Sequence, residues 1–285
     1  MVKIIADSTC DLSKELLAEY DISILPLHIV CQDEDYLDSV SISPEEIFEW
    51  SEANKTTPKT AAVGPGEAIE GIRPFVEVGA DVICISISDE LSTTGNVMRL
   101  AAQMFNEEAG REQVKVINSG NLSTGIGLLV IEAAIMAKDG VEAYKIVEQI
   151  ERMVPKVRAS FVVDTLTYLH RGGRCSGLAA LAGSALKLHP KIVVKNGKLE
   201  VDKKYRGSMK NVLIQYTHEM LDHFANAKTD RVFITHAMCD KAVVDAVREY
   251  ISELGIFEEV IETQAGGVVS SHCGPGTLGV LFLEK

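Results

Sequence analysis

One stretch of the chain decides the predicted fold: Val82-Ile83-Cys84-Ile85-Ser86-Ile87-Ser88-Asp89-Glu90-Leu91-Ser92-Thr93-Thr94-Gly95. Residues 82–87 predict a short buried strand, and residues 96–108 carry apolar side chains at helical spacing. The loop between them brings hydroxyl groups beside the unpaired backbone N–H groups of a helix start, where a phosphate or carboxylate can bind. For this segment alone, ordinary capping by Ser and Thr is favoured over a ligand site.

The same order of strand, polar loop and helix recurs in the first half of the chain. Residues 3–6 lead into Asp7-Ser8-Thr9, and residues 114–117 lead into Asn118-Ser119-Gly120-Asn121. This pattern indicates a parallel sheet with helices on both faces, and its polar loops meet at the carboxyl ends of the strands. The side chains expected near that edge are Asp7, Thr9, Ser86, Ser92 and Asn118.

Other elements follow from periodicity and turn residues. Residues 22–30 predict one strand with Pro26 at an edge or bend, and residues 55–66 predict a loop. A small-residue helix is expected at 177–188, and Asn196-Gly197 gives the strongest hairpin signal. Pro155 marks the best boundary, so we expect an N-terminal α/β domain at 1–155 and a C-terminal α/β domain at 156–285.

Composition restricts the class of function. The formal charge of −13 argues against nucleic-acid binding and fits a protein that handles small molecules. We expect no signal peptide, because the first residues lack a charged n-region and an apolar h-region, and no apolar run reaches the roughly 18 residues of a membrane span. The six cysteines are scattered without a CxxC pair, so we expect reduced thiols, a cytoplasmic location and no metal site.

Several catalytic signatures are missing from the sequence. There is no Walker loop, no Gly-x-Gly-x-x-Gly after the first strand and no Gly-x-Ser-x-Gly elbow. These absences lower the expectation of an NTPase, a dinucleotide enzyme or an α/β-hydrolase. The pair Asp7-Ser8 could bind a ligand or a metal, but turn and cap chemistry is favoured.

Two further regions carry candidate binding residues. His272 lies in Ser270-Ser271-His272-Cys273-Gly274-Pro275-Gly276, where small residues bring the backbone close to a ligand and the imidazole can donate to an anion. A loop histidine satisfied by backbone is an equal alternative. Arg171-Gly172-Gly173-Arg174 is either a phosphate or partner contact or a solvated turn. The basic group of Lys203, Lys204, Arg206 and Lys210 favours docking of a partner.

Five motifs together resemble those of one known family. They are Ile5-Ala6-Asp7-Ser8-Thr9-Cys10-Asp11-Leu12; Pro58-Lys59-Thr60 with Pro65-Gly66-Glu67; Ile87-Ser88-Asp89-Glu90-Leu91-Ser92-Thr93-Thr94; Asp164-Thr165-Leu166-Thr167-Tyr168-Leu169-His170-Arg171-Gly172-Gly173-Arg174; and His272-Cys273-Gly274-Pro275-Gly276. In this order they resemble the DegV family of bacterial fatty-acid-binding proteins, whose characterised members are the lipid-carrying FakB subunits of fatty-acid kinase. The resemblance covers essentially the whole chain.

The resemblance implies a Rossmann-like parallel-sheet domain, a C-terminal α/β domain and a fatty acid held between them. It places the carboxylate at the hydroxyls of Thr60 and Ser92, with the backbone N–H of Thr93 beside them and His272 approaching from the second domain. It also implies that Arg171, Arg174 and Arg206 face a kinase partner.

The chain departs from the family pattern in the loops of the site. Ala61-Ala62-Val63-Gly64 replaces Ser-Gln-Pro-Ser, Thr93 replaces a usual glycine, and Asn118 replaces a common Asp. Because Thr60, Ser92 and His272 are kept, we retain the carboxylate site. The substituted residues affect the other side chains expected to line this site.

We therefore expect a binding subunit without catalytic activity or cofactor. It would present a long-chain fatty acid to a separate kinase subunit, and any contact with a membrane surface would be transient. Ile126, Leu129 and Ile135 could line the acyl tunnel, although core packing is favoured for most of them. The alternative is a small-molecule hydrolase or transferase that uses Asp7, Ser92 and His272.

Overall fold

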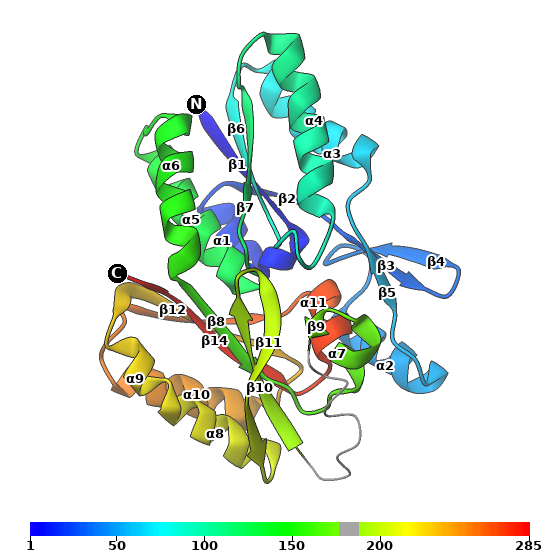
Figure 1. Ribbon diagram of the computed structural model, residues 1–285, viewed down its shortest axis with the longest axis vertical. Coiled ribbons are helices and arrows are strands. Elements are labelled where there is room, and N and C mark those ends of the chain that lie inside the picture. The colour runs from blue at the N-terminus through cyan, green and yellow to red at the C-terminus, as the bar shows by residue number, and fades with distance from the viewer. Residues whose placement is uncertain (177–187) are drawn as a thin grey trace.

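The computed structural model describes residues 1–176 and 188–285, arranged in two lobes (Figure 1). The N-terminal lobe is built on a parallel sheet with the strand order β2-β1-β6-β7. Its strands are β1 (Val2–Asp7), β2 (Ile22–Leu25), β6 (Asp81–Ser86) and β7 (Val114–Asn118). The predicted strand at 82–87 is therefore central in this sheet, where its apolar residues are buried on both faces.

Helices cover both faces of the parallel sheet, as predicted (Figure 1). One face packs against α3 (Pro65–Glu77) and α4 (Thr94–Ala109). The opposite face packs against α5 (Thr124–Lys138) and α6 (Ala143–Met153). The shorter elements of this lobe are the 3₁₀ turn η1 (Ser8–Cys10), α1 (Lys14–Glu19) and the 3₁₀ turn η2 (Val154–Lys156).

A small antiparallel sheet with the order β4-β3-β5 projects from the side of the molecule (Figure 1). It contains β3 (His28–Cys31), β4 (Glu34–Leu37) and β5 (Lys59–Ala61), and α2 (Pro44–Asn54) connects β4 to β5. Ser43 and Glu46 form a capping box at the start of α2, and Pro44 occupies the first helical position.

The C-terminal lobe is built on a mixed sheet with the order β13-β12-β14-β8-β10-β11-β9. Its strands are β8 (Val157–Val162), β9 (Cys175–Ser176), β10 (Leu188–Lys195), β11 (Lys198–Arg206), β12 (Ala227–Ala237), β13 (Glu259–Gln264) and β14 (Thr277–Glu284). Its helices are α7 (Thr167–Gly172), α8 (Met209–Glu219), α9 (Leu221–Phe224), α10 (Lys241–Glu253) and α11 (Gly267–Cys273). Helices α8, α9 and α10 cover the outer face of the sheet.

Helix α5 lies between the sheets of the two lobes. It contacts β1 and β6 on one side and β8 and β14 on the other. Residues 124–134 are all buried, which explains why the helix is apolar around its whole circumference. One core cluster therefore runs from Ile4 through Ile126 to Phe161 and Leu281.

Two carboxylates of the N-terminal half hold the start of α11. Asp38 Oδ1 accepts hydrogen bonds from the N–H groups of Gly267 (2.7 Å) and Val268 (3.2 Å). Asp11 Oδ1 accepts one from the N–H of Gly266 (2.8 Å). The first donors of α11 are thus satisfied by side chains from more than 200 residues away, which fixes the helix against the N-terminal half.

Three sequence expectations need correction or comment. The strand expected at 22–30 is divided into β2 and β3, because Pro26 lacks the N–H needed to continue a ladder and the chain moves to a second sheet. The loop expected at 55–66 contains β5, which pairs with β3. The helix expected at 177–188 lies outside the described residues except for Leu188, which begins β10.

The Asn196-Gly197 hairpin prediction is confirmed. Asn196 and Gly197 have φ values of 51° and 79° between β10 and β11, as a type I′ turn requires. The tip of the hairpin reaches the other lobe, where Ser88 Oγ donates to the carbonyl of Gly197 (2.7 Å). The hairpin thus forms a further contact between the lobes.

Replacing Asp38 should destabilise the whole fold. Asp38→Ala leaves the buried N–H groups of Gly267 and Val268 and the hydroxyl of Ser8 without their acceptor. We expect the free energy of unfolding to fall by roughly 2–4 kcal/mol, measured by urea denaturation. Asp33→Ala, an exposed aspartate nearby, is the control and should change it by less than about 0.5 kcal/mol. Equal stability of the two variants would contradict this role of Asp38.

Candidate functional site

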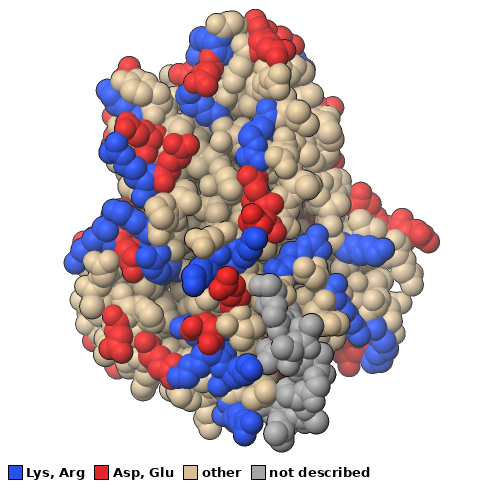
Figure 2. Space-filling model, in the orientation of Figure 1, with Lys and Arg blue, Asp and Glu red and all other residues tan. Residues whose placement is uncertain are grey.

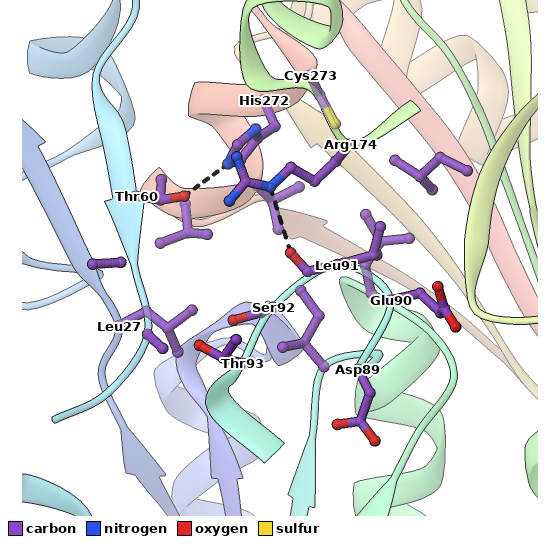
Figure 3. Close-up of a pocket in the computed structure, with 17 residues that line it drawn as sticks. Leu27, Thr60, Asp89, Glu90, Leu91, Ser92, Thr93, Arg174, His272 and Cys273 are labelled. Carbon is purple, nitrogen blue, oxygen red and sulfur yellow. Dashed lines mark hydrogen bonds between the residues drawn. The ribbon is translucent and has the colours of Figure 1, made fainter. Parts of the chain in front are cut away.

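A cavity of about 480 Å³ lies where the loop after β6, strand β5, helix α11 and the β10–β11 hairpin meet (Figure 3). Four predicted carboxylate-site residues line it: Thr60, Ser92, Thr93 and His272. The structure therefore brings together side chains that the sequence places in three distant segments. Their assigned roles remain predictions at this point.

Thr60 and His272 meet across the two halves of the chain. Thr60 Oγ1 lies 2.8 Å from His272 Nε2, although the residues are 212 positions apart. Strand β5 positions Thr60 through its pairing with Ile29, and α11 positions His272. The two polar groups form one hydrogen-bonded pair at the cavity wall (Figure 3).

His272 is neutral at physiological pH. Burial, the larger cause, and the nearby Arg174 guanidinium together lower the pKa of its imidazole to about 4. Its Nδ1 atom is buried and has no hydrogen-bond partner among the described residues. A Cβ atom at Gly172 would overlap this nitrogen, so glycine at 172 leaves the space in which the ring sits.

The loop between β6 and α4 presents the second group of hydroxyls. Ser92 Oγ lies 3.0 Å from Thr94 Oγ1 and accepts from the Thr94 N–H (3.3 Å). Thr93 is the N-cap residue of α4, and its side chain makes no capping hydrogen bond. The start of a 16-residue helix therefore adjoins the cavity, with hydroxyl groups beside its first N–H groups.

Arg174 lines the same cavity, which the sequence did not predict. Its Nη1 donates to the carbonyl of Gly172 (2.6 Å), and its Nε lies 3.5 Å from the carbonyl of Leu91 (Figure 3). A permanent positive charge therefore lies near the Thr60–His272 pair. The resemblance implies partner docking for Arg174, and the pattern at residues 171–174 leaves a phosphate or partner contact and a solvated turn open; no residue spacing indicates that Arg174 reaches the cavity.

The acidic side chains at the cavity have their own cationic partners. Asp89 Oδ1 lies 2.9 Å from Arg99 Nη2, and Glu90 Oε2 lies 3.3 Å from Lys198 Nζ. These pairs are partly exposed and turn the acidic charge toward the surface. Arg174 is therefore the charge that a negative ligand would meet beside the hydroxyls.

The remaining walls of the cavity are largely apolar. They are formed by side chains from six different segments of the chain: Leu27, Ala61, Ala62, Ile87, Leu91, Leu122, Leu199, Val268, Val269 and Cys273. An apolar pocket with a few convergent polar groups is typical of a small-molecule site. Ile126, Leu129 and Ile135 do not line this cavity; the first two are buried in the core and Ile135 packs against it, which agrees with the favoured expectation of core packing.

The groups required by the alternative enzyme hypothesis are not assembled as a catalytic set. Asp7 is buried, and its carboxylate accepts from the N–H groups of Thr9 (3.0 Å) and Ile87 (2.7 Å) and from the Thr9 hydroxyl. It does not line the cavity. His272 Nε2 bonds to Thr60 rather than to Ser92. The favoured reading of Asp7 as a turn and cap residue agrees with this geometry.

The two other predicted docking arginines lie on the surface. Arg171 is exposed at the end of α7, and Arg206 is exposed at the end of β11. Figure 2 shows basic side chains on the face of the molecule that carries the β10–β11 hairpin. Neither arginine lines the cavity.

No three His, Cys, Asp or Glu side chains are placed to bind a metal ion in residues 1–176 and 188–285. None of the helices in those two ranges has the length and apolarity needed to cross a membrane.

Comparison with known proteins identifies the relatives of this chain. The model of a family described as "uncharacterised protein, DegV family" matches residues 1–285. A DegV domain-containing protein of Deinococcus radiodurans is 32% identical over 281 residues, which cover 98% of this chain and 97% of that protein.

Two solved structures share the whole fold. One is described as fatty acid binding of a DegV family protein from Thermus thermophilus and matches with a TM-score of 0.89 and 29% identity, covering 100% of this chain and 99% of that one. The other, a stearic-acid-binding protein from Eubacterium ventriosum, matches with a TM-score of 0.88, 26% identity and the same coverage. These likenesses confirm the two-domain α/β fold. The boundary at residue 155 remains a prediction.

Removing the positive charge of Arg174 should raise the pKa of His272. In the wild type we expect the imidazole resonances to titrate near pH 4 in an NMR experiment, because burial and the guanidinium both disfavour the protonated ring. In Arg174→Met the midpoint should move upward but stay below the ordinary value of 6.5, since burial is the larger cause. Arg171→Met is the matched control. An unchanged midpoint in Arg174→Met would exclude the electrostatic contact.

Proposed function

The chain belongs to the DegV family, and on this premise we propose that it binds a long-chain fatty acid in the cavity lined by Thr60, Ser92 and His272. The proposal is carried by one observation: the hydrogen-bonded pair of Thr60 and His272 lies in the wall of a largely apolar cavity. The T. thermophilus and E. ventriosum proteins, which share the fold, are described as binding fatty acids.

The polar end of the cavity supplies donors for one carboxylate. A buried carboxylate is costly unless hydrogen bonds replace its water. We assign these bonds to the hydroxyls of Thr60 and Ser92 and the backbone N–H of Thr93. If His272 carries its proton on Nε2, it donates to Thr60 Oγ1 and leaves the Thr60 hydroxyl proton free for the ligand. This tautomer also avoids a buried N–H without an acceptor at Nδ1.

The apolar walls supply the larger part of the binding free energy. Each methylene that leaves water contributes roughly 0.8 kcal/mol, so a long acyl chain can offset the cost of desolvating its head group. The cavity volume of about 480 Å³ lies within the range of small-molecule sites. Short acids should bind weakly, since they offer the same carboxylate but less apolar surface.

We further propose that the protein acts as a binding subunit for a separate ATP-dependent kinase. The carboxylate would be presented at the cavity mouth and phosphorylated by the partner. Arg171 and Arg206 on the surface, and Arg174 at the mouth, would dock or orient that partner. The protein itself would contribute binding and orientation and no chemical step.

The nature of the bound ligand can be tested directly. Native mass spectrometry of the purified protein should reveal a copurified fatty acid of roughly 16–18 carbons, because the apolar contribution grows with chain length. A protein free of lipid that hydrolyses esters or phosphoesters would instead support the alternative hypothesis of a hydrolase or transferase.

Removing either hydroxyl should weaken fatty-acid binding without unfolding the protein. In Thr60→Ala or Ser92→Ala the carboxylate loses one donor, and we expect about 1.5–3 kcal/mol of lost binding free energy, or at least tenfold in Kd. Isothermal titration with palmitic acid measures the effect. Thr57→Ala, which alters a hydroxyl that does not line the cavity, is the control. Wild-type affinity in both site variants would refute the carboxylate assignment.

The docking role can be separated from lipid binding. Arg206→Ala should keep the affinity for the fatty acid but slow acyl-phosphate formation by the kinase at least tenfold, because the positive charge lies outside the cavity. Arg152→Ala, on the exposed side of α6, removes a surface arginine elsewhere and should change neither quantity. Phosphorylation at the wild-type rate in Arg206→Ala would end the docking proposal.

A further inference from the structure

His28 forms a bridge between two carboxylates on the outer side of the cavity wall. Its Nδ1 lies 3.0 Å from each carboxylate oxygen of Asp35, and its Nε2 lies 2.8 Å from Glu67 Oε2. Both nitrogens of an imidazole are donors in the protonated form, whereas a neutral ring has one donor and one acceptor. The carboxylates on both sides of the ring therefore favour the imidazolium. We call His28, Asp35 and Glu67 the His28 bridge.

The bridge spans the segment that carries Thr60. His28 pairs with Ala61 of β5 on one side and with Leu37 of β4 on the other. Asp35 belongs to β4, and Glu67 belongs to the first turn of α3, directly after β5. The bridge thus connects the strand before β5 to the helix after it.

Glu67 also fixes the turn that begins α3. The same Oε2 atom that faces His28 accepts a hydrogen bond from the N–H of Gly64 (2.7 Å). Thr60, Ala61 and Ala62, which line the cavity, lie between the two anchored ends of this segment. Leu27, the residue before His28, lines the cavity as well. A change at the bridge therefore acts on the wall from both sides.

We propose that His28 is a positioning residue for the fatty-acid site, and that loss of its proton loosens the wall at Thr60–Ala62 and speeds release of the ligand. The proposal rests on the fatty-acid-binding function proposed above. It adds a regulation that the cavity residues themselves do not provide. His28 acts through β5 and does not contact the ligand.

The charges around His28 set the direction of the pH effect. Burial lowers the pKa of His28, but hydrogen bonds and charges from Glu67 and Asp35 outweigh it and raise the pKa above the ordinary 6.5. These two carboxylates are the charged groups that face the ring, from α3 and β4, while β5 places Ala61 beside it. The bridge is therefore complete below pH 6.5 and is lost as the pH rises through the raised pKa.

Two other titratable groups, His272 and Asp7, have shifted pKa values that differ from that of His28. The pKa of His272 is lowered to about 4, so His272 stays neutral throughout the range above pH 6. Burial raises the pKa of Asp7 to about 6, so Asp7 ionises at the lower end of that range. A variant that lacks only the His28 imidazole separates the two contributions.

The test is the pH profile of ligand release. We would load the full-length protein with cis-parinaric acid, a fluorescent long-chain fatty acid, and measure its dissociation rate from pH 6 to pH 9. The wild-type rate should rise roughly three- to tenfold across this range, since two partly exposed ion pairs are lost. His28→Gln should release the ligand at the faster rate at every pH, without the His28-dependent rise.

A matched pair of glutamate variants separates the bridge from helix capping. Glu46 and Glu67 each accept a hydrogen bond from the N-cap backbone N–H of their helix, Ser43 at α2 and Gly64 at α3, but of the two only Glu67 also bonds to an imidazole. Glu67→Gln should flatten the pH profile, and Glu46→Gln should leave it as in the wild type. Asp35→Asn, on the exposed side of the bridge, should also reduce the rise and serves if His28→Gln does not fold.

The outcomes are distinct for the two proposals. Parallel pH profiles in wild type and His28→Gln, or in Glu67→Gln and Glu46→Gln, would overturn the role of His28 while leaving fatty-acid binding intact. Failure of the wild type to bind cis-parinaric acid at any pH would instead reject the proposed function, and the positioning role with it.

Discussion

The hydrogen bonds from the start of α11 to Asp11 and Asp38 are the interaction on which the site depends. Helix α11 carries His272, and Thr60 lies in a different part of the chain. The two carboxylates join these parts by accepting three backbone N–H groups at 266–268. Burial raises the pKa of both aspartates, and the hydrogen bonds that they accept oppose that rise. The position of His272 relative to Thr60 therefore depends on these buried hydrogen bonds.

Much of the fold followed from the sequence because local rules and tertiary packing agree. The apolar strand at 82–87, the capping box at Ser43 and the Asn196-Gly197 turn are each decided by a few adjacent residues. The break at Pro26 was visible, but the destination of the chain after it was not, because the partner of β3 is a three-residue strand some 30 positions later. Short strands have too little periodicity to be recognised alone.

The site was predictable only where a motif marked it. Thr60, Ser92, Thr93 and His272 lie in the quoted motifs, and all four line the cavity. Arg174 and Leu199 line it too, but their approach depends on how the chain after α7 and the β10–β11 hairpin fold back, which spacing along the chain does not report. The capping aspartates at 11 and 38 were missed for the same reason, since an interaction across more than 200 residues leaves no local pattern.

The position of α5 between the two sheets limits how the molecule can open. A hinge motion that separated the lobes would strip this helix from β8 and β14 and expose part of a continuous core to water. Strand β5 is exposed or half-buried and contributes no residue to that core cluster. An acyl chain would therefore enter by displacement of β5 or of the hairpin tip at Gly197, while the two lobes stay packed against α5.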